Sequence, residues 1–75
     1  MTFLKLFNKI VTKHTTLKDN GGFPKKIMLG TDEMDVFIQS LGDTVVEWDK
    51  HDMLKGVSVL GCKVGVWTKK GVTVL

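Results

Sequence analysis

The chain has 75 residues, of which 43% are hydrophobic and 25% charged, and its formal net charge is +3 at pH 7. This length suits one small domain, and the balance of apolar and charged residues argues against a disordered chain. Every cationic residue is a lysine, and the absence of arginine, which binds guanine and phosphate bidentately, argues against sequence-specific nucleic-acid recognition.

The first predicted element is a basic amphipathic helix over residues 2–13. Apolar residues recur at helical spacing, and lysines stack beside them at intervals of four. The apolar set is Phe3, Leu4, Phe7, Ile10 and Val11, and the lysines are Lys5, Lys9 and Lys13. β-Branched residues are frequent from Ile10 onward, so a strand over residues 10–17 is the alternative.

A glycine-rich break, Asp19-Asn20-Gly21-Gly22 followed by Phe23-Pro24, predicts a hinge over residues 19–24. This hinge would divide the helical segment 1–18 from a core at residues 25–75. Three arrangements are open for the helix. It packs on its own sheet, docks into a partner's groove, or lies on an anionic membrane.

The core begins with a predicted strand over residues 25–29 and a helix after it. Thr31 is the expected N-cap, and acids in the first turn complement the helix dipole. Apolar residues then follow at i, i+3, i+4 and i+7, and Gly42 stands where a helix ends. These apolar residues are Met34, Phe37, Ile38 and Leu41.

The C-terminal half is rich in strand-forming residues. Residues 44–48 read as a strand, 49–55 as a polar loop and 57–68 as strand, with glycines allowing bends. Lys69-Lys70-Gly71 predicts a tight turn into a last strand over residues 72–75. The predicted fold is therefore α+β: an N-terminal amphipathic helix, a β-α-β core and a C-terminal β-hairpin.

Alternation over the long strand segment predicts two apolar faces. One face carries Leu60, Cys62, Val64 and Val66, and the other carries Val57, Val59 and Trp67. A strand that is apolar on both faces is covered on both sides, either by helices or by another chain. We therefore expect Trp67 to take part in a protein contact.

No motif indicates catalysis, a cofactor or a metal. Acids crowd the strand-to-helix turn at residues 29–31 and would repel a phosphate there. Glu47, Asp49 and His51 alternate and would share a face on a strand as ligands, but a solvated acidic loop is the commoner structure. Cys62 lies in a valine-rich run, which favours a buried, inert thiol. We expect a non-enzymatic protein without a cofactor or metal.

Charge alternates along the chain. Residues 1–30 carry six lysines and one acid (+5), residues 31–52 seven acids and one lysine (−6), and residues 53–75 four lysines and no acid (+4). Such a chain offers partners both a cationic and an anionic surface. The predicted partner-binding residues are Phe3, Lys5, Phe7 and Lys9 of the helix, Glu47, Asp49 and Asp52 of the acidic segment, and Trp67.

Residues 24–60 resemble a pattern in short phage-encoded proteins and in segments of phage structural proteins. The similarity lies in the run from Pro24 to Glu33, in Leu41-Gly42, and in Gly56-Val57-Ser58-Val59. In those proteins a strand, a capped acidic helix ending in Leu-Gly and a Gly-Val strand follow one another. The resemblance implies a virion component or a small host-directed binder, with no catalytic residues to carry over.

The expected function is a small protein-binding module, as in a phage-type structural or assembly component whose +5 and −6 segments meet head to tail between copies. One alternative is a host-directed inhibitor that presents an acidic patch to its target. The other is a non-specific nucleic-acid binder that uses the lysines of residues 5–26 and 63–70. The lone cysteine suggests a reducing, cytoplasmic location, or the interior of a virion or other assembly.

Overall fold

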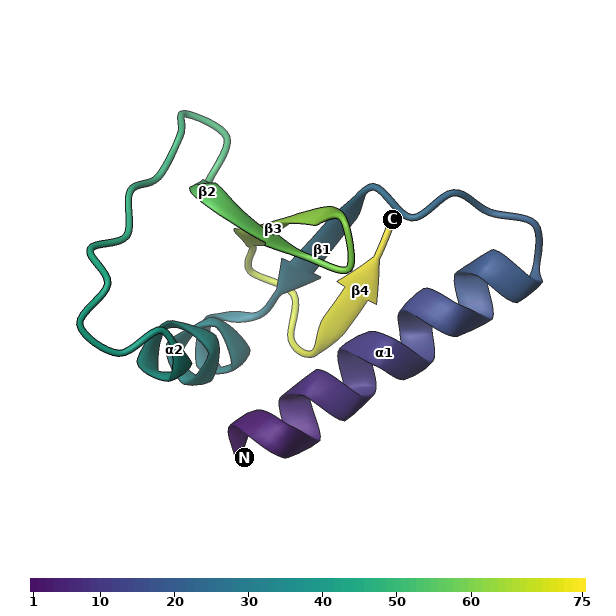
Figure 1. The fold of residues 1–75 in the computed structure, drawn as a ribbon, viewed down its shortest axis with the longest axis horizontal. Coiled ribbons are helices and arrows are strands. Elements are labelled where there is room, and N and C mark those ends of the chain that lie inside the picture. The colour runs from purple at the N-terminus through teal and green to yellow at the C-terminus, as the bar shows by residue number, and fades with distance from the viewer.

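Two helices and a four-stranded sheet make up the chain, which a computed structural model describes over residues 1–75 (Figure 1). The α+β class and the N-terminal helix predicted from the sequence are confirmed. The elements in chain order are α1 Phe3–Asp19, β1 Lys26–Leu29, α2 Thr31–Ser40, β2 Met53–Val59, β3 Cys62–Val66 and β4 Val72–Val74.

The strands lie in the order β2-β3-β1-β4. β1 runs parallel to β3 and antiparallel to β4, while β2 is the antiparallel neighbour of β3. A β-α-β unit is present as β1, α2 and β3, with β2 inserted before β3, whereas the second strand predicted for this unit, residues 44–48, is not formed. The predicted C-terminal hairpin is not formed, because β4 pairs with β1 and not with β3. The intervening segment passes the end of β1, where the Gly30 N–H donates to the Gly71 carbonyl at 3.0 Å.

The hairpin of this fold joins β2 to β3 through the two residues Leu60 and Gly61. Val59 pairs with Cys62, and the φ angles of Leu60 and Gly61 are 52° and 78°. Two consecutive positive φ angles are the signature of a type I′ turn, which matches the twist of the flanking strands. The prediction that Leu60 shares a strand face with Cys62 is therefore wrong.

Leu60→Asn is expected to raise the free energy of unfolding by about 0.5–1 kcal/mol, because asparagine tolerates the left-handed conformation and Asn-Gly favours this turn. The side chain of Leu60 is 47% exposed, so the replacement removes little buried apolar surface. Urea titration measures the difference in the free energy of unfolding, and the m value should be the same for both proteins. A loss of stability would contradict the expectation and would assign the Leu60 side chain a packing role.

Helix α1 is longer than predicted and packs within its own fold. Leu6 and Ile10 are 0% and 1% exposed, and both belong to the main hydrophobic core. Packing of this stripe overrides the strand preference of residues 10–17. Figure 1 shows α1 alongside β4, and α1 also contacts α2. Of the three arrangements considered for this helix, the structure shows packing on the chain's own sheet.

The N-terminus of α2 is tied to the segment that leads into β4. Gly30 is the N-cap, without a side-chain hydrogen bond, so the prediction of Thr31 as the cap is wrong by one residue. The Glu33 carboxylate accepts a hydrogen bond from the Gly71 N–H at 3.0 Å. Glu33 thus binds a neighbouring loop as well as complementing the helix dipole. Gly42, with φ of 65°, lies just after the helix, as predicted.

The segment after α2 differs from its prediction. Residues 44–48 form no strand beyond an isolated bridge between Trp48 and Leu54, and β2 already begins at Met53. Val46 packs against the core but Val45 is 86% exposed, and no partner strand pairs with this β-branched run.

The core lies between the two helices and one face of the sheet. Val57 and Val59 pack against this core together with Cys62, so the prediction that they lie opposite Cys62 with Trp67 is wrong. The buried residues of this core are Leu6, Ile10, Ile27, Leu29, Met34, Phe37, Leu54, Cys62, Val64 and Val72. Both helices therefore cover the same side of the sheet.

Candidate functional site

The predicted partner-binding residues of α1 lie on two faces of the helix, because residues two apart in the sequence point in nearly opposite directions. Phe3 and Phe7 lie on one face and Lys5 and Lys9 on another; with the exposed Leu4 between them, these residues of the first two turns are here called the N-terminal patch. The Phe3 and Phe7 rings lie with their centroids 6.0 Å apart and are 37% and 36% exposed, while Leu4 is 69% exposed. The Thr2 side chain accepts the Lys5 N–H at 3.3 Å and caps the first turn. The patch thus consists of a half-buried aromatic pair, an exposed leucine beside it, and two lysines on another face of the same helix turns.

A second aromatic contact anchors this patch to the body of the protein. The Phe3 ring lies 6.5 Å, centroid to centroid, from the ring of Phe37, which is only 3% exposed. Tilted aromatic pairs at this separation are favourable. The patch is therefore presented by a helix that the core holds in place.

The acidic residues Glu47, Asp49 and Asp52 lie in a tight loop, here called the acidic turn (residues 47–52). The Asp49 N–H donates to the Met53 carbonyl at 2.9 Å, and the Lys55 N–H donates to the Glu47 carbonyl at 2.9 Å. Asp52 has a φ of 61°, as expected at the left-handed position of a three-residue hairpin loop. The backbone thus fixes the shape of the turn, and Glu47 and Asp52 are exposed on it.

Asp49 has a structural role in this turn. Its carboxylate accepts the Met53 N–H at 3.1 Å and the His51 N–H at 2.7 Å. These backbone hydrogen bonds, that of Met53 first, hold the pKa of the Asp49 carboxyl below its ordinary value. No group of three or more His, Cys, Asp or Glu side chains is arranged to hold a metal ion.

Asp49→Ala is expected to destabilise the fold at pH 7, and the difference from the native chain should shrink in acid. Because the folded state has the lower pKa, ionisation of Asp49 favours folding. This contribution is full above the unfolded pKa of about 3.9 and disappears as the pH falls through the folded pKa. Urea titrations at neutral and acidic pH test it, with the exposed Asp43→Ala as control. A pH-independent difference would contradict the assignment.

Trp67 follows β3 and is partly covered by its own chain. The Lys69 ammonium lies 5.0 Å from the ring centroid, in a cation–π contact. The indole N–H is buried and makes no hydrogen bond, while the backbone N–H donates to the Leu29 carbonyl at 3.0 Å. Trp67 is consequently a half-buried residue, less free to anchor a partner than the sequence suggested.

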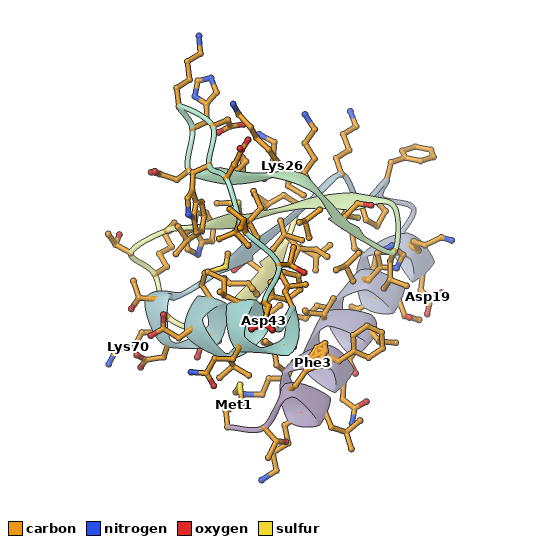
Figure 2. All side chains as sticks on the ribbon, turned by 60° about the vertical axis from the view of Figure 1, so that its left-hand side comes forward. Met1, Phe3, Asp19, Lys26, Asp43 and Lys70 are labelled. Carbon is orange, nitrogen blue, oxygen red and sulfur yellow. The ribbon has the colours of Figure 1, made fainter.

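The predicted site residues do not form one site. Figure 1 places the loop that enters β2 at one extreme of the molecule and the N-terminus of α1 at the other, and Figure 2 shows Met1 and Phe3 on the helix side of the sheet. The structure therefore separates the N-terminal patch from the acidic turn. Trp67 belongs to the latter region, since the Asp52 carbonyl accepts the N–H of its neighbour Val66 at 3.0 Å.

Cys62 is a core residue. Its side chain is 0% exposed, and burial raises the pKa of the thiol above its ordinary value. The sulfur lies 3.8 Å from the Leu60 carbonyl oxygen, to which the thiol donates. A protonated, buried thiol is a poor nucleophile.

Comparison of this chain with protein-family models, with curated proteins and with solved structures found no match. Function must therefore be inferred from the chain's own surfaces. No helix has both the length and the apolar character that crossing a membrane requires.

One surface was missed by the sequence analysis: the sheet face that no helix covers, here called the open face. Lys26 and Lys63 are direct neighbours there, in the parallel register of β1 with β3. Both lysines are exposed, while the residues after them, Ile27 and Val64, point into the core and are 0% exposed. Only the pairing of strands distant in sequence reveals this pair.

Proposed function

We propose that this chain is a small, non-enzymatic protein-binding module that assembles head to tail with copies of itself. A phage-type structural or assembly component requires such a repeating contact. The observation that carries the proposal is the pair of complementary surfaces on opposite sides of the molecule. Because Cys62 is a free, buried thiol, we place the protein in a reducing compartment or within a virion.

The two surfaces complement each other in charge and in apolar character. The N-terminal patch combines exposed apolar side chains with Lys5 and Lys9. The acidic turn carries three carboxylates, and beside them Val45 and Trp48 are 86% and 38% exposed. Apolar contact supplies most of the stabilisation in such an interface, and opposite charges fix its register.

The geometry favours contacts between molecules over contacts within one molecule. The two surfaces lie at opposite extremes, so a patch cannot reach the acidic turn of its own chain. Two different surfaces that bind each other make a heterologous contact, which generates rings or open filaments. We therefore expect oligomers larger than dimers.

Charge reversal tests this contact. In sedimentation velocity at high protein concentration and low salt, the native chain is expected to form oligomers that dissociate as salt is added. Lys9→Glu and Glu47→Lys should each leave monomers. An equimolar mixture of the two variants should form oligomers in which the variants alternate, because the native contact and the charge-reversed contact are both complementary. The double variant should recover oligomers.

Lys70→Glu is the matched control, since it makes the same charge change outside both surfaces. It should assemble like the native chain. A native protein that stays monomeric at all concentrations would overturn head-to-tail assembly. Tight binding of that monomer to one other protein through the acidic turn would instead support the inhibitor alternative.

A further inference from the structure

The open face lies on the side of the sheet away from both helices. Figure 2 shows Lys26 on the far side of the sheet from Phe3 and Asp43. The core residues of α1 and α2 all join one cluster with Ile27, Leu29 and Val64, so both helices occupy the opposite side. Further along the same strands, Met28 and Met53 flank Gly65 in register and are only 8% and 6% exposed, so that part of the face is covered and the exposed part is the end with Lys26 and Lys63.

Lysines cross this face from strand to strand. Lys26 on β1 neighbours Lys63 on β3, and Lys63 in turn neighbours Ser58 on β2. Lys55 lines the same groove as Lys63. Like charges directly opposite each other on a sheet are destabilising, so the folded chain gains nothing from the Lys26–Lys63 pair by itself. An anionic ligand would relieve this repulsion.

A groove of about 510 Å³ runs along the edge strand β2, beside Lys63. Its lining is Asp49, Leu54, Lys55, Gly56, Val57, Ser58 and Lys63. Space beside Gly56 is open, since a Cβ built there would meet nothing within 4 Å. The one carboxylate in the groove belongs to Asp49, which is already bound by two backbone N–H groups. Two ammonium groups and a hydroxyl remain for a ligand.

We propose that the open face binds the phosphate backbone of a single-stranded nucleic acid without sequence preference. Strands lie about 4.8 Å apart, so Lys26 and Lys63 present two adjacent positive charges that consecutive phosphates of one strand neutralise together. An isolated carboxylate brings one negative charge and would leave the lysine pair with a net positive charge. A duplex groove accepts a protruding helix or ribbon, and the open face has neither. Lysine without arginine suits attraction that ignores sequence.

Fluorescence anisotropy with a labelled oligothymidylate of about 20 nucleotides, which exceeds the site of a small domain, tests the proposal. The native chain should bind it, and the affinity should fall steeply between about 50 and 200 mM salt. In the double variant Lys26→Gln/Lys63→Gln, the slope of log affinity against log salt should decrease by about 1.4, which corresponds to two lost contacts with single-strand phosphates.

The matched control is Lys5→Gln/Lys9→Gln, which removes the same charge from α1. The salt dependence of its oligonucleotide binding should equal that of the native chain, even if the loss of Lys5 and Lys9 impairs assembly. The experiment therefore tests nucleic-acid binding independently of head-to-tail assembly. Thermal melting followed by circular dichroism excludes unfolding. The Lys26→Gln/Lys63→Gln variant should melt no lower than the native chain, because a like-charge pair has been removed.

Three results would overturn the inference. No binding at low salt would do so directly. An equal loss of slope in both double variants would assign the attraction to net charge instead of the open face. Tighter binding to a duplex of the same length, or equal displacement of the oligonucleotide by polyglutamate, would show that the surface is built for another polyanion.

Discussion

Leu6→Ala is expected to lower the free energy of unfolding by about 2–5 kcal/mol, because a fully buried leucine is replaced by a cavity. The Leu6 side chain is 0% exposed and joins α1 to the main core. A domain of this size has only about 3–5 kcal/mol of stability in total. The variant should therefore be largely unfolded at 25 °C, with a weak or absent transition in urea followed by circular dichroism.

Leu4→Ala is the matched control, two positions away on the same helix. Leu4 is 69% exposed, so its truncation should change stability by no more than about 0.5 kcal/mol. Equal, small effects of both substitutions would contradict the packing of α1. Such a result would instead support a helix that is joined to the core by a hinge at the glycine-rich residues 19–24.

Phe37→Ala is expected to cost about 3–5 kcal/mol, since it removes a buried aromatic side chain. Phe37 is 3% exposed on α2 and contacts the Phe3 ring of α1. The loss should abolish cooperative unfolding in urea. Phe37→Leu, which preserves most of the volume, should fold with a loss of about 1 kcal/mol and keeps the prediction measurable.

Phe23→Ala is the control for Phe37→Ala, because it removes the same phenyl group from an exposed position. Phe23 is 84% exposed, and its removal should leave the unfolding midpoint almost unchanged. A double-mutant cycle of Phe3→Ala with Phe37→Leu should show coupling of about 0.5–1.5 kcal/mol. A Phe37→Ala variant as stable as Phe23→Ala would contradict the packing of α2 on the core.

These two substitutions also bear on the proposed function. Phe37 supports Phe3, and Leu6 holds the helix that carries the N-terminal patch. Loss of assembly in either variant would follow from unfolding and would not identify a contact residue. The charge reversals at Lys9 and Glu47 are suited to that purpose because both side chains are exposed.

Elements defined by neighbouring residues were predictable. The α2 stripe of Met34 and Phe37, the acids of its first turn and the glycine at its end all act within one helix, and the structure confirms that helix. The signal for a strand at residues 44–48 was equally local but misleading. β-Branched residues favour a strand only where a partner strand and a buried face exist, and Val45 has neither.

Pairing between distant segments was not predictable. The turn residues Lys69-Lys70-Gly71 indicate a change of direction but not which strand the chain then joins. The choice of β1 as the partner of β4 depends on where α1 and α2 leave sheet edge and core surface uncovered. Leu60-Gly61 was overlooked as the hairpin because leucine rarely adopts the positive φ that this turn requires.

The sequence by itself determined the α+β class, the two helices, the burial of Cys62 and the division of the chain into basic and acidic segments. These properties depend on composition and on spacing within a few residues. Only the tertiary structure decided that the N-terminal patch and the acidic turn lie apart, and that Lys26 meets Lys63. Those relations depend on strand order and register, which the whole core selects because a shift of one residue would expose its buried face.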